Sequence, residues 1–115
     1  ITTEEYDRAL VVENLTFTDG FMDMQGNVQT GGPYDAYHYT SKISVSAGDV
    51  VALENGSDMR CITAYNGTSV VSDKGYSGYI TSYIVPSGID GVIVTIFDDQ
   101  KLGGALWIIL AYLSF

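Results

Sequence analysis

The chain has 115 residues, the size of one ordinary domain, and 46% of them are hydrophobic while 17% are charged. This composition can form a hydrophobic core, which excludes an intrinsically disordered protein. Fourteen acidic and five basic residues give a formal net charge of −9, which disfavours nucleic acids and anionic membrane surfaces as partners. The most apolar run, at residues 105–115, is about half as long as a membrane-spanning helix. We therefore expect neither a nucleic-acid partner nor insertion into a membrane.

The first segment with a recognisable pattern is "TTEEYDRAL" near the start of the sequence. Thr2 and Glu5 have the spacing of a capping box, and acidic residues fill the first turn, where they favour a helix. These signals predict one short helix over residues 3–10. We expect residues 1–18 to form this helix and a lead-in segment, and residues 19–115 to form one β domain.

After this segment, turn sequences rich in Gly, Asn and Asp recur at the short spacing found in all-β proteins. The strongest hairpin signal is "YNGT" at residues 65–68, because Asn-Gly suits the tight turn that joins two antiparallel strands. The pattern therefore predicts an all-β fold, an antiparallel two-sheet sandwich with no helix besides the N-terminal one. The predicted strands lie near residues 20–24, 27–30, 37–46, 50–54, 59–65, 68–72, 78–85, 91–97 and 105–114.

The predicted strand at residues 37–46 carries the only histidine of the chain. Successive side chains of a strand point to opposite faces, so Tyr37, Tyr39 and Ile43 share one face. We expect both tyrosines to lie over the core, with their hydroxyl groups near its edge. His38 falls on the other face with Thr40, and we expect it to face solvent.

The C-terminal segment "ALWIILAYLSF" is apolar on both faces of the predicted strand. An antiparallel strand normally turns one face to the core and one to water, so the second face needs a cover. Either the strand is central and is covered by a loop or by the N-terminal helix, or it packs against another copy of the chain. We favour the second explanation, because a sandwich of 115 residues has little extra mass with which to cover both faces. The segment "GVIVTIF" at residues 91–97 is similarly two-faced and is a natural neighbour of this strand. The predicted oligomer interface consists of Leu106, Trp107, Ile108, Leu110 and Tyr112.

The titratable residues match no catalytic or metal-binding motif. One His and one Cys are too few for a zinc site, and the chain has no nucleophile elbow, phosphate loop or calcium loop. Cys61 lies in the apolar run "MRCITAY", so we expect a buried, unreactive thiol. A small hydrolase using His38 and an aspartate would need groups that meet only in the folded chain. We therefore expect no enzymatic activity, no metal and no cofactor.

Carbohydrate is the ligand that best suits the remaining polar and aromatic residues, because sugars are commonly held by an aromatic face with polar side chains nearby. We expect several tyrosines to lie in loops or near strand ends, beside acidic and amide groups. The alternative is that Tyr79, Tyr83 and Val85 form one inward-facing row, which would leave only Tyr76 free. The candidate ligand-binding residues are Tyr34, Asp35, Asn66, Asp73, Tyr76 and Tyr79.

Four segments also resemble a known class of module. They are "GFMDMQGNVQTG", "YHYTSKISVSAGDVVAL", "CITAYNGTSVVSD" and "YIVPSGIDGVIVTIF". Together they are similar to the jelly-roll-like β-sandwich module of phage tail, head-fibre and receptor-binding proteins and of gut-bacterial surface proteins. The resemblance covers about two-thirds of the chain and rests mostly on turns and core positions. It implies a jelly-roll-like fold that is often trimeric and sometimes binds cell-surface glycan, and it carries no catalytic residues.

These observations predict a non-enzymatic fibre-tip or surface-attachment module, a homotrimer that binds cell-surface carbohydrate. Its location would be a phage virion or a bacterial cell surface. The alternative is a purely structural oligomerisation or capsid-decoration domain without a ligand. A groove lined by Tyr34, Tyr76 and Asn66 would favour binding, since ligand sites are concave.

Overall fold

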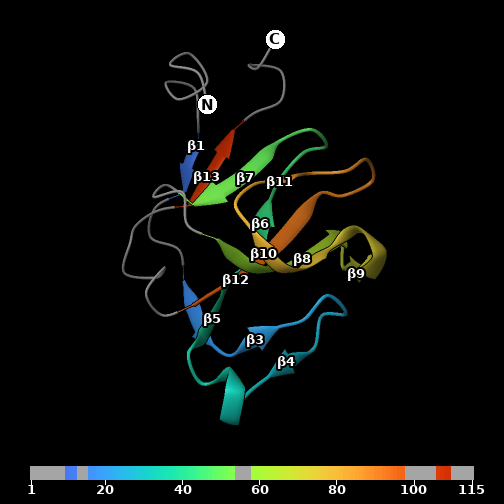
Figure 1. Cartoon of the computed structure of the whole chain (residues 1–115). Coiled ribbons are helices and arrows are strands. Elements are labelled where there is room, and N and C mark those ends of the chain that lie inside the picture. The colour runs from blue at the N-terminus through green and yellow to red at the C-terminus, as the bar shows by residue number, and fades with distance from the viewer. Residues whose placement is uncertain (1–9, 13–15, 54–57, 98–105, 110–115) are drawn as a thin grey trace.

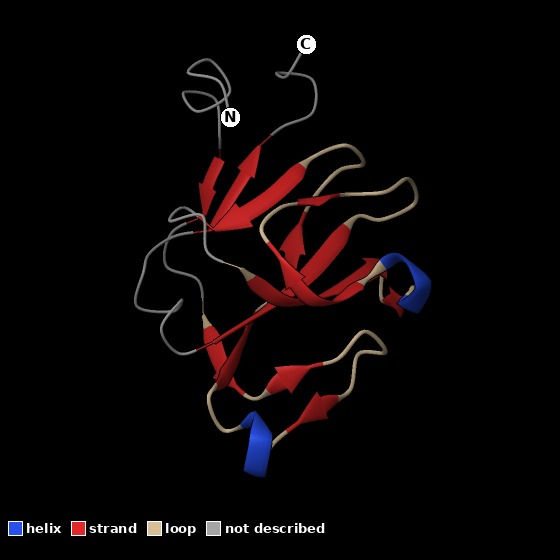
Figure 2. Ribbon diagram, viewed as in Figure 1, coloured by secondary structure: helices blue, strands red, loops and turns tan. Residues whose placement is uncertain are grey.

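The computed structural model describes residues 10–12, 16–53, 58–97 and 106–109. Within these ranges the protein consists of antiparallel strands and two single-turn 3-10 helices, η1 (Gly32–Tyr34) and η2 (Ser72–Lys74) (Figures 1 and 2). The predicted all-β, antiparallel architecture is confirmed. The predicted helix over residues 3–10 lies outside the described residues, except for Leu10, which begins a strand.

The described strands form three sheets (Figure 1). A four-stranded sheet has the order β1-β13-β7-β11, a larger sheet has the order β10-β8-β12-β5-β2, and β3 and β4 form a separate two-stranded hairpin. In the larger sheet, β6 also pairs with β12 and β9 with β8. The bounds are β1 (Leu10–Val12), β2 (Phe17–Asp19), β3 (Phe21–Met22), β4 (Val28–Gln29), β5 (Tyr37–Thr40), β6 (Ile43–Ser44), β7 (Val50–Leu53), β8 (Met59–Asn66), β9 (Ser69–Val70), β10 (Tyr76–Ile80), β11 (Tyr83–Ile84), β12 (Gly91–Phe97) and β13 (Leu106–Ile109).

Two local features of this arrangement bear on the predictions. The β8–β9 hairpin is present where "YNGT" predicted it: Asn66 pairs with Ser69, and Gly67, with a φ of 62°, lies in the two-residue turn between them. In the predicted lead-in segment, the described strands β1 and β2 pair with β13 and β5. The lead-in thus contributes strands to both larger sheets.

The main hydrophobic core joins the four-stranded sheet to the larger sheet. It brings Val51 of β7 and Tyr83 of β11 together with Ile62 of β8 and Val94 of β12, all of them buried. Burying an aliphatic side chain of this size contributes about 1.5–3 kcal/mol relative to leaving it exposed. This shared core fixes how the two sheets lie against each other.

The β3–β4 hairpin packs against β5, β8 and β12 of the larger sheet. Two buried threonines bind its backbone. Thr95 Oγ1 accepts a hydrogen bond from the Met22 N–H and donates one to the Met22 carbonyl, both at 3.2 Å. Thr63 Oγ1 donates to the Asp23 carbonyl at 2.8 Å. Every residue of β12 except the last is buried, so one chain covers both faces of the two-faced segment at residues 91–97.

The predicted orientation of the strand that carries the histidine is wrong. In β5, His38 and Thr40 are buried, whereas Tyr37 and Tyr39 are only half-buried. His38 pairs with Ile96, a member of the main core, so the histidine lies on the core side of the sheet. The tyrosines lie on the opposite side, which the hairpin partly covers.

A β-bulge explains the reversal. Between the pairs Thr95–Tyr39 and Val92–Ile43, β12 advances by three residues while the opposite chain advances by four. One extra residue, near Ser41, is therefore inserted between β5 and β6, and it shifts the alternation of side chains by one position. Even-numbered residues of β5 and odd-numbered residues of β6 consequently face the same core.

The C-terminal strand β13 is central in its sheet, between β1 and β7. Its register places Ile108 opposite the core residue Val51 and Trp107 opposite Ala52, which is half-exposed. This central position is required if the apolar strand is covered by other parts of the same chain, which was the first of the two explanations. Leu110 and Tyr112 lie outside the described residues. The oligomer interface of Leu106, Trp107, Ile108, Leu110 and Tyr112 stays a prediction.

Candidate functional site

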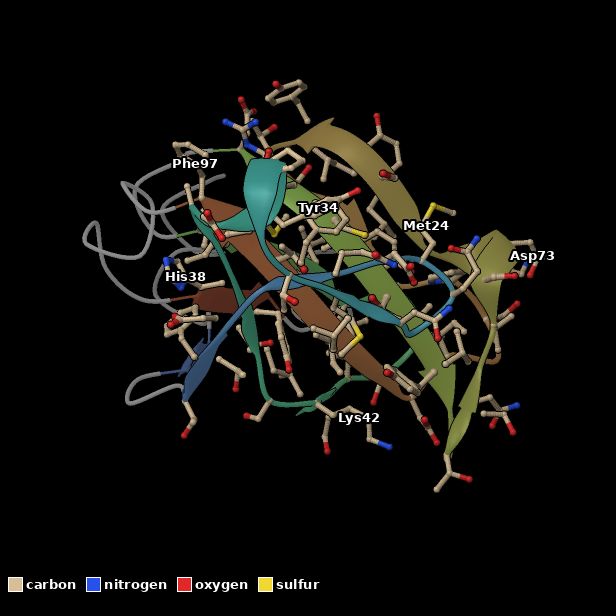
Figure 3. The ribbon with its side chains drawn as sticks, turned by 90° about the horizontal axis from the view of Figure 1, so that it is seen from below. Met24, Tyr34, His38, Lys42, Asp73 and Phe97 are labelled. Atoms are coloured by element: carbon tan, nitrogen blue, oxygen red, sulfur yellow. The ribbon has the colours of Figure 1, made fainter. Side chains whose placement is uncertain are left out.

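A row of aromatic rings runs beside the hairpin, on the side of the larger sheet away from the main core. The ring of Phe21 in β3 lies 5.6 Å from that of Tyr34 and 5.0 Å from that of Tyr37, between ring centroids. Tyr37 in turn contacts Phe97 at 5.3 Å, edge to face. Tyr37 and Phe97 are paired across β5 and β12, which places them on the same face. Figure 3 shows Tyr34 and Phe97 on this side of the molecule.

Arg60 of β8 joins this row to one more ring. Its guanidinium carbon lies 4.2 Å from the ring centroid of Tyr79 and 5.2 Å from that of Phe97. An arginine over an aromatic face is held by the attraction between the cation and the ring quadrupole, worth about 0.5–2 kcal/mol. The aromatic row therefore ends in a positively charged group.

A second β-bulge presents Tyr79 to Arg60. Ser77 pairs with Cys61 and Ile80 with Met59, so β10 has one residue more than β8 in this stretch. The bulge contains Gly78, whose φ of 133° is a conformation that side chains with a Cβ rarely adopt. Glycine at this position allows the neighbouring tyrosine to turn out over β8.

Two shallow depressions border the row, and the Tyr34–Phe21 ring contact lies between them. The first, which we call the aromatic depression, has a volume of about 160 Å³, and its described lining residues include one cation and no carboxylate. The second, the acidic depression, has a volume of about 140 Å³, and the described residues that line it include two carboxylates and no cation. The aromatic depression is lined by Phe21, Tyr37, Arg60, Ser77, Gly78 and Tyr79. The acidic depression is lined by Asp19, Gly20, Thr30, Gly31, Tyr34 and Asp35.

The volumes indicate what could bind there. Pockets that enclose drug-sized ligands have about 300–1,000 Å³, about two to six times the roughly 160 Å³ of the aromatic depression. It suits a single ring or a single acid group that belongs to a larger ligand. The rest of such a ligand would extend over the surface.

Arg60 forms no hydrogen bond or ion pair through its side chain with the described residues, and its Nε atom is buried without a partner. An unsatisfied buried donor costs about 1–3 kcal/mol. Elsewhere on the sheet, Nδ1 of His38 lies at hydrogen-bonding distance, 2.8 Å, from Oδ1 of Asp19. The cation of the aromatic depression thus retains its capacity to bind an acceptor.

The depressions include three of the six predicted ligand-binding residues. Tyr34 and Asp35 line the acidic depression, and Tyr79 lines the aromatic one. The side chain of Tyr79 is 67% exposed, whereas Tyr83 and Val85 are buried. The alternative of one inward-facing row is therefore wrong for Tyr79, because the bulge and the end of β10 separate it from the buried pair.

The other three predicted residues do not line either depression. The ring of Tyr76 lies beside Gly78, 3.5 Å from the position that a Cβ there would take, so it borders the aromatic depression from outside. Asn66 lies six residues beyond Arg60 on β8, which corresponds to roughly 20 Å along a strand. Figure 3 shows Asp73 at the edge of the molecule opposite Phe97. The two depressions thus do not unite Tyr34, Tyr76 and Asn66 in one groove.

Four residues of the row were not among the predicted ones: Phe21, Tyr37, Arg60 and Phe97. For Arg60 a signal existed, because an arginine inside the apolar run "MRCITAY" calls for a partner or a function. The assignment of Tyr37 to the core followed from an uninterrupted strand, which the bulge overturns. The neighbours of Phe21 and Phe97 come from distant parts of the chain.

Three further findings concern the thiol, metal binding and membrane helices in the described part of the chain. Cys61 is buried, as predicted. Its burial, with a smaller effect of the Asp23 charge, raises the pKa of its thiol to about 12, so the thiolate is scarce near neutral pH. No group of three or more His, Cys, Asp or Glu side chains in the described ranges could hold a metal ion. None of the described residues belongs to a helix that could cross a membrane.

No protein-family model matches the chain, and neither a curated protein nor a solved structure is significantly similar to it. The assignment to phage-fibre or surface modules therefore stays a prediction based on the sequence segments quoted above.

Proposed function

We propose that the protein is a non-enzymatic attachment module, at a phage fibre tip or on a bacterial surface, that binds cell-surface carbohydrate in the aromatic depression. The observation that carries the proposal is the exposed ring of Tyr79, held next to Arg60 and Tyr37 at one depression. The resemblance of four sequence segments to fibre and surface modules supports the same role.

Sugar recognition fits this site because its two requirements are present side by side. A sugar presents a C–H face that packs against an aromatic ring, and Tyr79 offers such a ring to solvent. Its hydroxyl groups need hydrogen-bond partners, which Arg60, Ser77 and the tyrosine hydroxyls can supply. The rings already contact one another, so little conformational freedom is lost on binding.

The detailed fold is part of the proposal. We assign the four-stranded sheet and the larger sheet to a jelly-roll-like sandwich, with the β3–β4 hairpin as an added layer. The core shared by β7, β8, β11 and β12 supports this assignment, as do strand orders that place distant segments next to each other. Such a fold leaves the hairpin side free to carry the binding site.

Glycan-array screening followed by titration with a monovalent sugar tests the carbohydrate proposal. Replacing Tyr79 by Ala should weaken binding at least about fivefold, which corresponds to about 1 kcal/mol. Ile84→Ala is the matched control, because Ile84 is also 67% exposed but lies on the edge strand β11 of the other sheet. Absence of any glycan signal, or equal affinities of the wild type and Tyr79→Ala, would contradict the proposal.

A structural role in oligomerisation is the second candidate, and one observation favours it. On the four-stranded sheet Ile84 is 67% exposed, and its partner Val50 is only half-buried. The apolar strand β13 lies next to Val50 in the same sheet. We propose that this sheet contributes to the interface of a homotrimer.

Native mass spectrometry tests the oligomer. A trimer has three times the 12.4 kDa mass of one chain, and Ile84→Lys or Trp107→Glu should shift the population to single chains. A wild-type protein that is monomeric at micromolar concentration would exclude this candidate. The glycan titration uses a monovalent sugar, so assembly does not affect its outcome.

A further inference from the structure

On the basis of the proposed carbohydrate binding, we infer that the aromatic depression selects an acidic sugar, whose carboxylate binds the guanidinium of Arg60. Arg60 is the residue that would distinguish an acidic sugar from a neutral one. Three features of the site support this selectivity: the unpaired arginine, the distribution of charge and the exposed ring.

The first feature is the bonding state of Arg60. Its guanidinium contacts the rings of Tyr79 and Phe97, and rings attract a cation without accepting hydrogen bonds in the plane of the guanidinium. The in-plane N–H donors therefore remain unused. A carboxylate matches this fork of donors with two parallel hydrogen bonds, which are short and charge-assisted. The stacked rings also hold the guanidinium in place before the ligand arrives.

The second feature is the placement of charge. Among the residues that the structure describes, Arg60 is the only charged one that lines the aromatic depression, whereas Asp19 and Asp35 line the acidic depression beyond the Tyr34–Phe21 contact. An acid group is therefore attracted at one depression and repelled at the other. This asymmetry gives an acidic ligand one orientation along the row of rings.

The third feature is the ring that would support the sugar itself. Tyr79 is the most exposed residue of the aromatic depression for which stacking is possible, and its ring contacts the guanidinium directly. A sugar ring on Tyr79 would thus carry its carboxylate toward Arg60. The Ser77 hydroxyl, at the same depression, can bind a sugar hydroxyl.

The net charge of −9 does not prevent this contact. At physiological ionic strength charges farther apart than about 8 Å are largely screened, so the neighbouring cation dominates the field at the bound acid. A monosaccharide carries a single charge and experiences little of the long-range repulsion that a polyanion would. It is therefore the appropriate probe.

We would test the inference by ¹H–¹⁵N NMR titration of the whole chain with three sugars: methyl β-glucuronide, its methyl ester and methyl β-glucoside. The chain has only two arginines, Arg8 and Arg60, so an Arg60→Lys variant assigns the Nε–H signal. The glucuronide should shift that signal and bind at least about tenfold more tightly than either neutral sugar, as expected for a charge-assisted bidentate pair.

Two variants complete the test. Arg60→Gln should abolish the preference for the acidic sugar while it retains weak binding of the glucoside. Lys42→Gln is the matched control, because the Lys42 ammonium also lies over a ring, that of Tyr65 at 5.1 Å, but outside the depression. It should leave the preference unchanged. Should Arg60→Gln fail to fold, the comparison of acid and ester on the unaltered chain still decides.

The outcomes separate this inference from the proposed function. Equal binding of the glucuronide and the glucoside would overturn the acid selectivity and leave carbohydrate binding intact. No binding of any sugar would overturn both. Inorganic phosphate, titrated alone, should shift the Arg60 signal much less than the glucuronide; an equal shift would indicate a general oxyanion site and overturn the assignment to acidic sugars.

Discussion

Replacing Thr95 by Val should release the β3–β4 hairpin from the larger sheet. The side chain of Thr95 is fully buried on β12, and its hydroxyl group both accepts from and donates to the backbone of Met22. Valine has nearly the same shape, so the substitution removes the hydroxyl group without leaving a cavity. The change therefore isolates the hydrogen bonds that dock the hairpin.

The magnitude follows from the hydrogen bonding of the hairpin. The Asp23 N–H donates to the Asn27 carbonyl, so the next pair, Met22–Val28, is a non-hydrogen-bonded pair of the antiparallel ladder. The Met22 N–H and carbonyl therefore point away from β4, and Thr95 is their partner. Leaving a buried donor or acceptor unsatisfied costs about 1–3 kcal/mol, so Thr95→Val should lower the free energy of unfolding by about 2–4 kcal/mol.

Thr63→Val provides a graded control. Thr63 donates to the Asp23 carbonyl, but that carbonyl also accepts a hydrogen bond from the Gly26 N–H and keeps this partner in the variant. The cost should be about 1 kcal/mol, the net worth of one ordinary hydrogen bond. Two threonines that are both fully buried are thus expected to differ in effect.

Urea denaturation followed by circular dichroism measures both variants, and amide hydrogen exchange localises the effect. The Met22 amide should be protected in the wild type and should exchange rapidly in Thr95→Val. Equal stabilities of the two variants, the reverse order, or a protected Met22 amide in Thr95→Val would refute the proposed docking. Because Phe21 lies on the same hairpin, glycan binding should weaken together with docking.

Three further predictions follow from the geometry. Alkylation of Cys61 by iodoacetamide at pH 8 should be at least about 1,000-fold slower in the folded protein than in the urea-unfolded chain. The reason is that burial raises the pKa of the thiol from 9.0 to about 12, and each pKa unit changes the thiolate fraction about tenfold. Comparable rates in the two states would contradict the burial of Cys61. Since the pKa of this thiol is higher in the folded state, the thiol contributes a stabilisation that is fully present below pH 9 and is lost as the pH rises toward about 12. Urea denaturation midpoints measured between pH 8 and 11 should therefore fall more steeply for the wild type than for Cys61→Ala. Parallel curves for the two proteins would exclude the effect. Gly78→Ala should lower the free energy of unfolding by about 1–3 kcal/mol and weaken glycan binding, because a φ of 133° strains any other residue. Gly88→Ala is the control, since Gly88 also has a positive φ and no atom lies near the added Cβ. It should destabilise the protein without affecting binding, and an equal loss of binding in both variants would argue against the bulge as the cause.

The sequence predicted several features because they depend on neighbouring residues. The hairpin at "YNGT" and the burial of Cys61 in an apolar run are of this kind, and both are confirmed, although the two turn residues are Gly67 and Thr68, one position beyond the predicted Asn-Gly pair. The direction in which the side chains of residues 37–40 point was predicted wrongly, because it was also inferred from neighbouring residues alone. Alternation along one strand assumes an unbroken strand, and the extra residue near Ser41 is visible only in the pairing with β12.

In the candidate site, too, local features could be predicted and the pairing between strands could not. Tyr34, Asp35 and Tyr79 could be selected from the sequence as exposed aromatic and polar residues, and they do line the two depressions. Their relation to Arg60 could not be predicted. It requires the bulge at Gly78, and a bulge is defined by two strands together.

The sequence by itself determined that this chain forms antiparallel strands, since turn residues and β-branched residues act through local backbone preferences. Only the tertiary structure decided which side of each strand became core and which became site. That choice depends on register between segments distant in the chain, and one inserted residue reverses every side chain beyond it. The β3–β4 hairpin over β12, and the arginine beside its rings, are consequences of that register.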